Sequence, residues 1–190
     1  MRTFLASPPV SAFAMVMGLS GLSLIWFKFA AIAAYPEAIT VANIFGLLAT
    51  LVFLILSLGL LRKQWVSPEK LIEEWNHPVK SAFFGAISVG VCLLAAVIYH
   101  YSVTLAEYVW LSGAALHLVA MLAVLNAWVH RENLQAAHAC PVWFIPAVGN
   151  VVIPLGGVRL GYIELSWFFY GIGLIFWVVL LSLVMYRLMF

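Results

Sequence analysis

The chain has 190 residues, of which 66% are hydrophobic and only 8% are charged, and its formal net charge is +2. Soluble globular domains carry roughly 25% charged residues, so this composition excludes a water-soluble core. The few cations form no clustered basic face, which gives no case for nucleic-acid binding. All acidic residues are glutamates and the two cysteines form no CxxC motif. We therefore expect neither an enzyme nor a bound metal or cofactor.

Apolar runs of membrane length fill most of the sequence. A bilayer span needs about 20 mostly apolar residues, and six such runs are predicted over about 9–34, 39–61, 79–100, 104–129, 141–161 and 165–187. A Pro-Val pair opens three of them, at Pro9, Pro78 and Pro141. The predicted fold is all-α and membrane-integral. We expect one transmembrane domain over 1–190, built as three repeated helical hairpins over about 9–61, 78–129 and 141–187.

The loops between these runs predict the orientation in the membrane. Short cytoplasmic loops are enriched in Lys and Arg. With six spans, Arg159 lies on one side, with Lys28 near it. The other side carries seven cations, namely Arg2, Arg62, Lys63, Lys70, Lys80, Arg131 and Arg187. We therefore expect both termini of the chain in the cytoplasm.

One of these cytoplasmic loops carries a helix-start signal. Ser67-Pro68-Glu69 combines an N-cap residue, a proline at the first helical position and an acid in the first turn. This pattern predicts a short surface helix over about Pro68–Trp75.

The runs that begin with proline carry small or helix-breaking residues at helical spacing. In the fifth run the interior prolines exclude a regular helix. Close helix packing explains small residues equally well, but broken backbone at membrane depth occurs only inside protein or along a cavity. The second interpretation predicts a pore along the odd-numbered helices, lined by Gly18, Gly21, Ser81, Gly85, Ser88, Pro146, Gly149 and Asn150.

The charge of this pore entrance favours anions. A helix N-terminus carries about half a positive charge, and three such termini would meet on the cytoplasmic side. Lys80 in the first turn of the third helix adds a full charge there, so we expect it to attract anions. Among other polar groups, His117 is expected to be a neutral imidazole bonded to a neighbouring helix, and Lys28 is expected to extend its ammonium group to the membrane surface.

Three segments resemble a known family. They are His77 to Ser81 (HPVKS), Pro141 to Asn150 (PVWFIPAVGN) and Gly18 to Phe27 (GLSGLSLIWF). They are similar to segments of the bacterial tellurite-resistance/C4-dicarboxylate transporter family, which includes the slow-type anion channels of plant guard cells. The resemblance implies a ten-helix fold of five hairpins around a pore, assembly as a homotrimer, and passive or gradient-coupled passage of small anions through a channel or carrier.

The chain departs from that family pattern in length. It matches the first six of ten helices, so we expect a C-terminally truncated form. In the family a phenylalanine of the ninth helix closes the pore, and no residue here is assigned that role. Three hairpins would leave an open groove, so we expect the chain alone not to conduct. Two alternatives remain open: a membrane haem or redox subunit, with His77 and His130 as a candidate ligand pair, and a non-conducting structural subunit.

Overall fold

The computed structural model describes residues 7–131 and 139–189, and every regular element in these ranges is helical. Five helices are long and apolar enough to cross a membrane. They are α2 (Ala14–Ala33, preceded by the 3-10 turn η1, Val10–Phe13), α3 (Glu37–Val66), α5 (Phe84–Ile98, preceded by η2, Lys80–Phe83), α6 (Val103–His130) and α9 (Ile163–Met189).

The sixth expected span is not a long helix. Residues 141–157 divide into η4 (Pro141–Trp143), α7 (Phe144–Val148), η5 (Gly149–Val151) and α8 (Pro154–Gly157). Proline has no N–H to donate, and its ring collides with the preceding turn, so Pro146 and Pro154 interrupt the ladder of hydrogen bonds. The predicted irregularity is confirmed, whereas six long helices are not: the described residues contain five.

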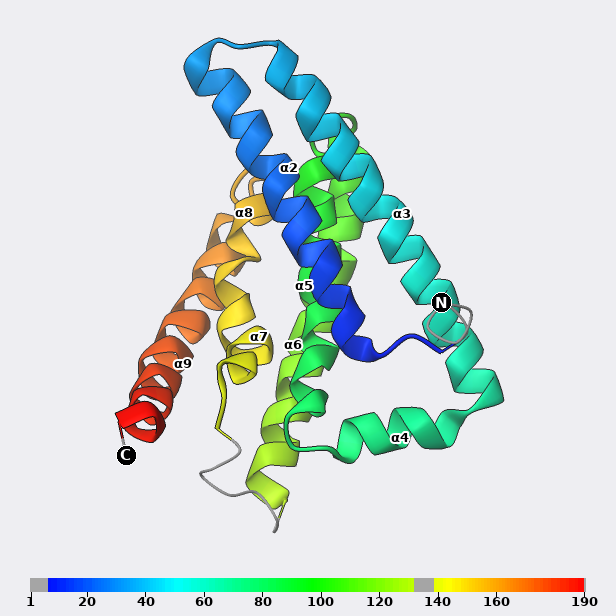
Figure 1. Cartoon of the computed structure of the whole chain (residues 1–190). Coiled ribbons are helices and arrows are strands. Elements are labelled where there is room, and N and C mark those ends of the chain that lie inside the picture. The colour runs from blue at the N-terminus through cyan, green and yellow to red at the C-terminus, as the bar shows by residue number, and fades with distance from the viewer. Residues whose placement is uncertain (1–6, 132–138, 190) are drawn as a thin grey trace.

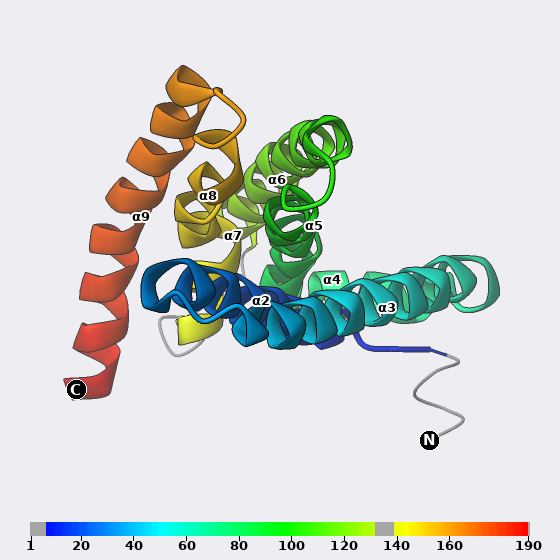
Figure 2. The same cartoon turned by 90° about the horizontal axis from the view of Figure 1, so that it is seen from above.

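The three segments that begin with proline run in one direction, and α3, α6 and α9 return in the other (Figure 1). We call the end where η1, η2 and η4 begin the proline end of the bundle. Helix α5 is central, because it packs against α2, α6, α7 and α8. The span that contains α5 is 72% buried, whereas the spans of α3 and α9 are each 22% buried. Seen from above, α3 and α9 lie on opposite sides of α5 (Figure 2).

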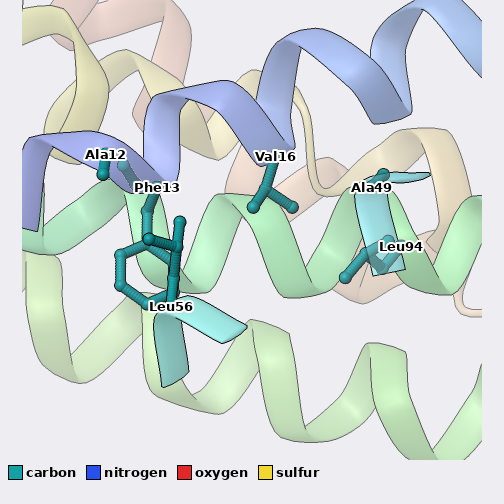
Figure 3. Packing of buried hydrophobic residues seen from close by; sticks show 7 residues of the cluster. Ala12, Phe13, Val16, Ala49, Leu56 and Leu94 are labelled. Carbon is teal, nitrogen blue, oxygen red and sulfur yellow. The ribbon is translucent and has the colours of Figure 1, made fainter. Parts of the chain in front are cut away.

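Buried apolar side chains join η1 and α2 to α3 and α5. Figure 3 shows Phe13 and Val16 pointing into a cluster with Ala49, Leu56 and Leu94. Both Phe13 and Val16 are completely buried. Helix association inside a membrane rests on close packing, because lipid tails are as apolar as these side chains. This cluster holds the first helix pair onto the central helix.

A surface helix, α4 (Pro68–Asn76), follows α3, and it lies across the proline end of the bundle (Figure 1). Helix α3 continues past its predicted end at residue 61 because no helix breaker occurs before Ser67. The residue before a proline avoids the helical region, and Ser67 has φ −148° and ψ 61°. Pro68 occupies the first turn of α4 as predicted, but the Ser67 side chain makes no capping hydrogen bond.

Candidate functional site

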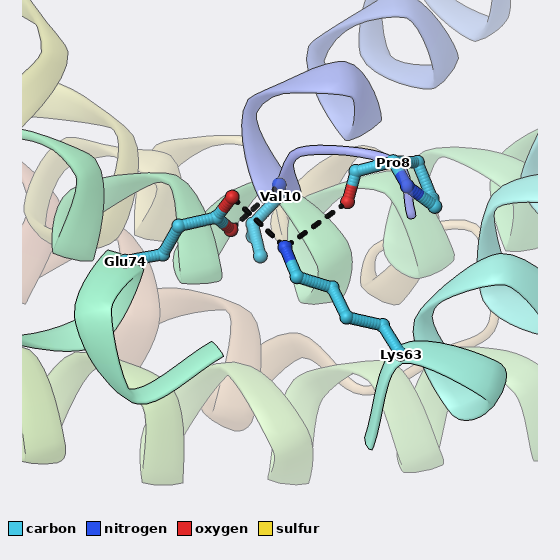
Figure 4. Close-up of polar contacts among 4 residues, drawn as sticks. All are labelled: Pro8, Val10, Lys63 and Glu74. Carbon is cyan, nitrogen blue, oxygen red and sulfur yellow. Dashed lines mark hydrogen bonds and ion pairs between the residues drawn. The ribbon is translucent and has the colours of Figure 1, made fainter. Parts of the chain in front are cut away.

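A buried lysine joins three segments at the proline end. Lys63 of α3 is 3% exposed, and its Nζ lies 2.9 Å from Oε1 of Glu74 in α4. The same ammonium donates to the carbonyl oxygen of Pro8 at 3.3 Å, and Glu74 Oε2 accepts from the backbone N–H of Val10 at 3.1 Å. Figure 4 shows these contacts converging on one point. We call this group of four residues the lysine clasp.

Lys80 lies beside the lysine clasp. It is exposed and lines a polar cavity of about 300 Å³ together with Lys63, Lys70, Glu73 and Glu74. The cavity therefore contains three ammonium groups and two carboxylates. The position of Lys80 at a pore entrance stays a prediction, and the carboxylates in this cavity reduce the positive potential around its ammonium group.

Gly18 and Gly21 of α2 lie on an open face of the helix. Apart from adjacent residues and the backbone of the same helix, no atom of the described residues lies within 4 Å of the position that a side-chain Cβ would take at either glycine. Neither glycine is therefore needed for close packing within the described part of the chain. Of the eight predicted lining residues, these two face unfilled space.

Ser81, at the start of the third run, is buried and held by a loop cation. Nη1 of Arg131, which follows α6, donates to Ser81 Oγ at 3.0 Å. Nη2 of Arg131 donates to the carbonyl oxygen of Trp75 in α4. Burial lowers the pKa of Arg131, although a guanidinium stays charged at neutral pH. Arg131 thus connects α4, η2 and the end of α6 at the proline end.

The remaining predicted residues meet at the contact of α5, α6 and α7. Ser88 Oγ and His117 Nδ1 are 2.9 Å apart, and both side chains are completely buried. This contact confirms that His117 bonds to a neighbouring helix. A methyl group at Gly149 would lie 2.8 Å from Val89 Cγ2 and 3.2 Å from His117 Cε1. Gly149 is therefore required for close approach.

A second close contact of the same kind joins α5 and α7. A methyl group at Gly85 would lie 2.8 Å from the Cα atom of Pro146. Helix backbones approach this closely only where a residue lacks a side chain. Ser88, Gly85, Pro146 and Gly149 are thus brought together, and each has a packing contact.

Asn150 stabilises the broken segment. Its Nδ2 donates to the Ala147 carbonyl oxygen at 2.7 Å and lies 3.0 Å from Met121 Sδ of α6. Its Oδ1 is buried and has no hydrogen-bond partner among the residues described. Asparagine side chains that bond to nearby backbone substitute for bonds that a broken helix cannot make.

Two residues at the centre of this architecture were not singled out from the sequence. Trp110 of α6 is completely buried and donates from Nε1 to the Ile153 carbonyl oxygen at 2.9 Å. A methyl group at Gly156 would lie 2.7 Å from Trp110 Cδ1. No local pattern indicated this partner of Trp110. Lys63 had been assigned to a loop. The absence of a helix breaker between residues 61 and 66 could have indicated that it lies in the helix.

The two histidines of the haem alternative bond to the backbone. His77 Nδ1 accepts from the N–H groups of Val79 and Lys80, at 3.2 and 3.3 Å. His130 Nδ1 lies 2.9 Å from the carbonyl oxygen of Asn126 in its own helix. In both rings the Nδ1 atom therefore forms a hydrogen bond to nearby backbone at the end of a helix.

The sequence is similar to known membrane transport proteins. The profile of the SLAC1 family, described as voltage-dependent anion channels, matches residues 8–190. A tellurite resistance protein of Haemophilus influenzae, a TehA homolog, is 27% identical over 90% of this chain and 52% of its own length. An uncharacterized transporter of Methanocaldococcus jannaschii is 27% identical over 98% of this chain and 58% of its own length.

A plant protein shows the same similarity. An S-type anion channel of Arabidopsis thaliana is 26% identical over 97% of this chain and 37% of its own length. The chain spans about half the length of the two microbial relatives. Together with its five long apolar helices, these matches show that the chain is an integral membrane protein and belongs to the SLAC1 family of voltage-dependent anion channels.

Proposed function

We propose that the protein moves small anions across a membrane, passively or coupled to a gradient, as part of a channel or carrier. The relatives include a tellurite resistance protein and S-type anion channels. The fold supports the same function, because a bundle of membrane-length helices contains a segment of irregular backbone over residues 141–157, packed against the central helix α5.

The proposed path runs along the side of the bundle formed by α2, α5 and the α7–α8 segment. The observation that carries this proposal is the open face of α2 at Gly18 and Gly21, where no protein atom lies within 4 Å of a Cβ position. The other predicted lining residues of this path stay a prediction: they are Ser81, Gly85, Ser88, Pro146, Gly149 and Asn150. Their contacts within the bundle support a second role, which is to hold the wall of the path in place.

We further propose that the repeat consists of three hairpins, α2–α3, α5–α6 and α7–α9. The packing of α2 on α3, of α5 on α6 and of α7 on α9 supports this interpretation. In the proposed orientation the proline end faces the cytoplasm, in accordance with the distribution of Lys and Arg. Assembly as a homotrimer in a bacterial inner membrane is part of the same proposal and follows the family resemblance.

A chimera tests the proposed function. Residues 8–190 of this chain would replace the matching segment of the Haemophilus relative, and the chimera would be reconstituted in liposomes loaded with chloride or nitrate. We expect anion efflux above that of protein-free liposomes. Gly18→Trp in the chimera is expected to reduce this efflux at least tenfold, because an indole would fill the open face of α2.

Gly171→Trp is the matched control. Gly171 lies in α9 and also has no atom within 4 Å of its Cβ position, but it lies outside the proposed path. If a folded chimera shows no efflux while its parent does, this segment is structural and does not conduct. If Gly18→Trp and Gly171→Trp behave alike, the open face of α2 contacts lipid instead of a path.

A further inference from the structure

A second cavity lies at the end of the bundle opposite the proline end. Its volume is about 480 Å³, within the range of small-molecule sites. All three segments that begin with proline contribute to it, through Gly21, Leu24 and Lys28 of α2, Leu93 of α5, and Leu155 and Arg159 of α8 and the turn that follows it.

The cavity combines an apolar wall with two cations. Lys28 and Arg159 line it, and the described residues that line it include no acidic side chain. The ion pair found in the described part of the chain is Lys63–Glu74, so neither Lys28 nor Arg159 has a carboxylate partner there. Both residues are exposed, and two cations without a carboxylate partner give this end of the bundle a positive potential that attracts an anion.

An aromatic ring lies beside one of these cations. The Arg159 guanidinium carbon lies 5.9 Å from the centre of the Tyr99 ring, at the end of α5. Such a cation–π contact restricts the guanidinium without neutralising it. The planar guanidinium presents parallel N–H donors, which match the paired oxygens of a carboxylate or nitrate better than a spherical halide.

We propose that Lys28 and Arg159 form an oxyanion-binding site in this cavity. Arg159 binds a planar oxyanion through paired hydrogen bonds, and Lys28 adds a second positive charge from the opposite helix. If this site is a subsite at the mouth of the proposed path, the inference rests on the proposed function. It then adds the residues that hold the anion and the chemical class of that anion. A carboxylate in solution and the phosphate of a lipid headgroup share the required chemistry.

Equilibrium binding tests the site without any need for conduction. The 190-residue chain would be placed in phosphatidylcholine nanodiscs, and sodium succinate, sodium nitrate and sodium chloride would be titrated by calorimetry. We expect the two oxyanions to bind more tightly than chloride. Lys28→Gln and Arg159→Gln should each weaken succinate binding at least about tenfold, since Lys28→Gln removes a positive charge and Arg159→Gln removes the paired charged hydrogen bonds.

A second arm identifies the source of the oxyanion. Nanodiscs that contain phosphatidylglycerol would be compared by native mass spectrometry for retained lipid. If both substitutions reduce lipid retention while wild-type protein binds no succinate, the site stands and its occupant is a headgroup. Arg62→Gln is the matched control, because Arg62 is an exposed cation of α3 outside this cavity.

The inference and the proposed function can fail separately. If Lys28→Gln and Arg159→Gln change neither succinate affinity nor lipid retention relative to Arg62→Gln, the site is overturned, even where the chimera conducts. If both substitutions weaken binding but no chimera conducts, the site stands and the transport function fails. Thermal unfolding of each variant confirms that the comparison is made between folded proteins.

Discussion

Lys63 and Glu74 form an ion pair of 2.9 Å between the end of α3 and the surface helix α4, with the lysine side chain only 2% exposed. A buried charge is tolerated only where its partners satisfy it. Here the partners include the carbonyl oxygen of Pro8, so the start of the first span depends on the same ammonium group. The lysine clasp therefore couples three segments that the sequence places far apart.

Removing the charge of Glu74 should destabilise the proline end. Glu74→Gln keeps the size of the side chain but leaves the Lys63 ammonium without a counter-ion. We expect a loss of about 2–4 kcal/mol in stability, since breaking a buried pair leaves an uncompensated charge. Thermal unfolding in detergent, followed by circular dichroism, measures the change.

Glu73→Gln is the control for this experiment, because Glu73 is exposed and adjacent in sequence. Exposed substitutions usually change stability by less than about 0.5 kcal/mol. Equal melting temperatures for the two variants would show that the clasp contributes nothing to stability.

A matched pair of glycines tests whether Gly149 is a packing residue. Gly149→Ala should destabilise the protein by about 1–3 kcal/mol, because its methyl group would lie 2.8 Å from Val89 Cγ2. Gly171→Ala should be neutral or stabilise α9 by up to about 1 kcal/mol, since the methyl group meets no neighbour. Chemical or thermal unfolding of the two variants side by side measures the difference. Identical shifts would contradict the close contact of α5, α6 and α7.

The hydrogen bond from Trp110 should determine the geometry of the broken segment. Trp110→Phe keeps an aromatic ring beside Tyr162, whose ring centre lies 5.2 Å away, but leaves the buried Ile153 carbonyl without this donor. We expect a loss of about 1–3 kcal/mol in stability and a change in the near-ultraviolet circular dichroism spectrum. Trp167→Phe serves as the control, because Trp167 is 65% exposed in α9. A Trp110 variant as stable as that control would contradict this role.

Local chemistry explains which features could be predicted from the sequence. The helix over Pro68–Asn76 was anticipated almost to the residue, because Ser67 and Pro68 constrain the backbone by themselves. The irregularity of residues 141–157 was anticipated for the same reason, since prolines interrupt a helix wherever they lie within it. The apolar run itself could not distinguish a long helix from four short turns.

Contacts between distant segments could not be predicted in this way. The sequence indicated that His117 needs a polar partner, but only packing shows that it is Ser88. Lys63 was interpreted as a loop residue, and its partners Pro8 and Glu74, which lie in two other segments, could not be identified from the sequence. The stripes of small residues were equally compatible with a pore and with close packing, and the structure shows packing contacts at Gly85 and Gly149 but open space at Gly18 and Gly21.

Mild acid should destabilise the protein through His100, in the turn between α5 and α6. Its ring stacks on Phe27 with centroids 3.8 Å apart. Burial lowers the pKa of His100 below its usual value of 6.5, and the nearby Arg159 charge adds to this effect. Below pH 6.5 the His100 side chain is therefore protonated more readily in the unfolded chain than in the folded chain. The free energy of unfolding is retained above that pH and falls as the pH decreases through it. We expect the melting temperature to drop between pH 7.5 and pH 5.5, and His100→Phe, which keeps the stacked ring, to reduce that drop. Because all other histidines are unchanged in the variant, an equal drop in both proteins would assign the acid sensitivity elsewhere.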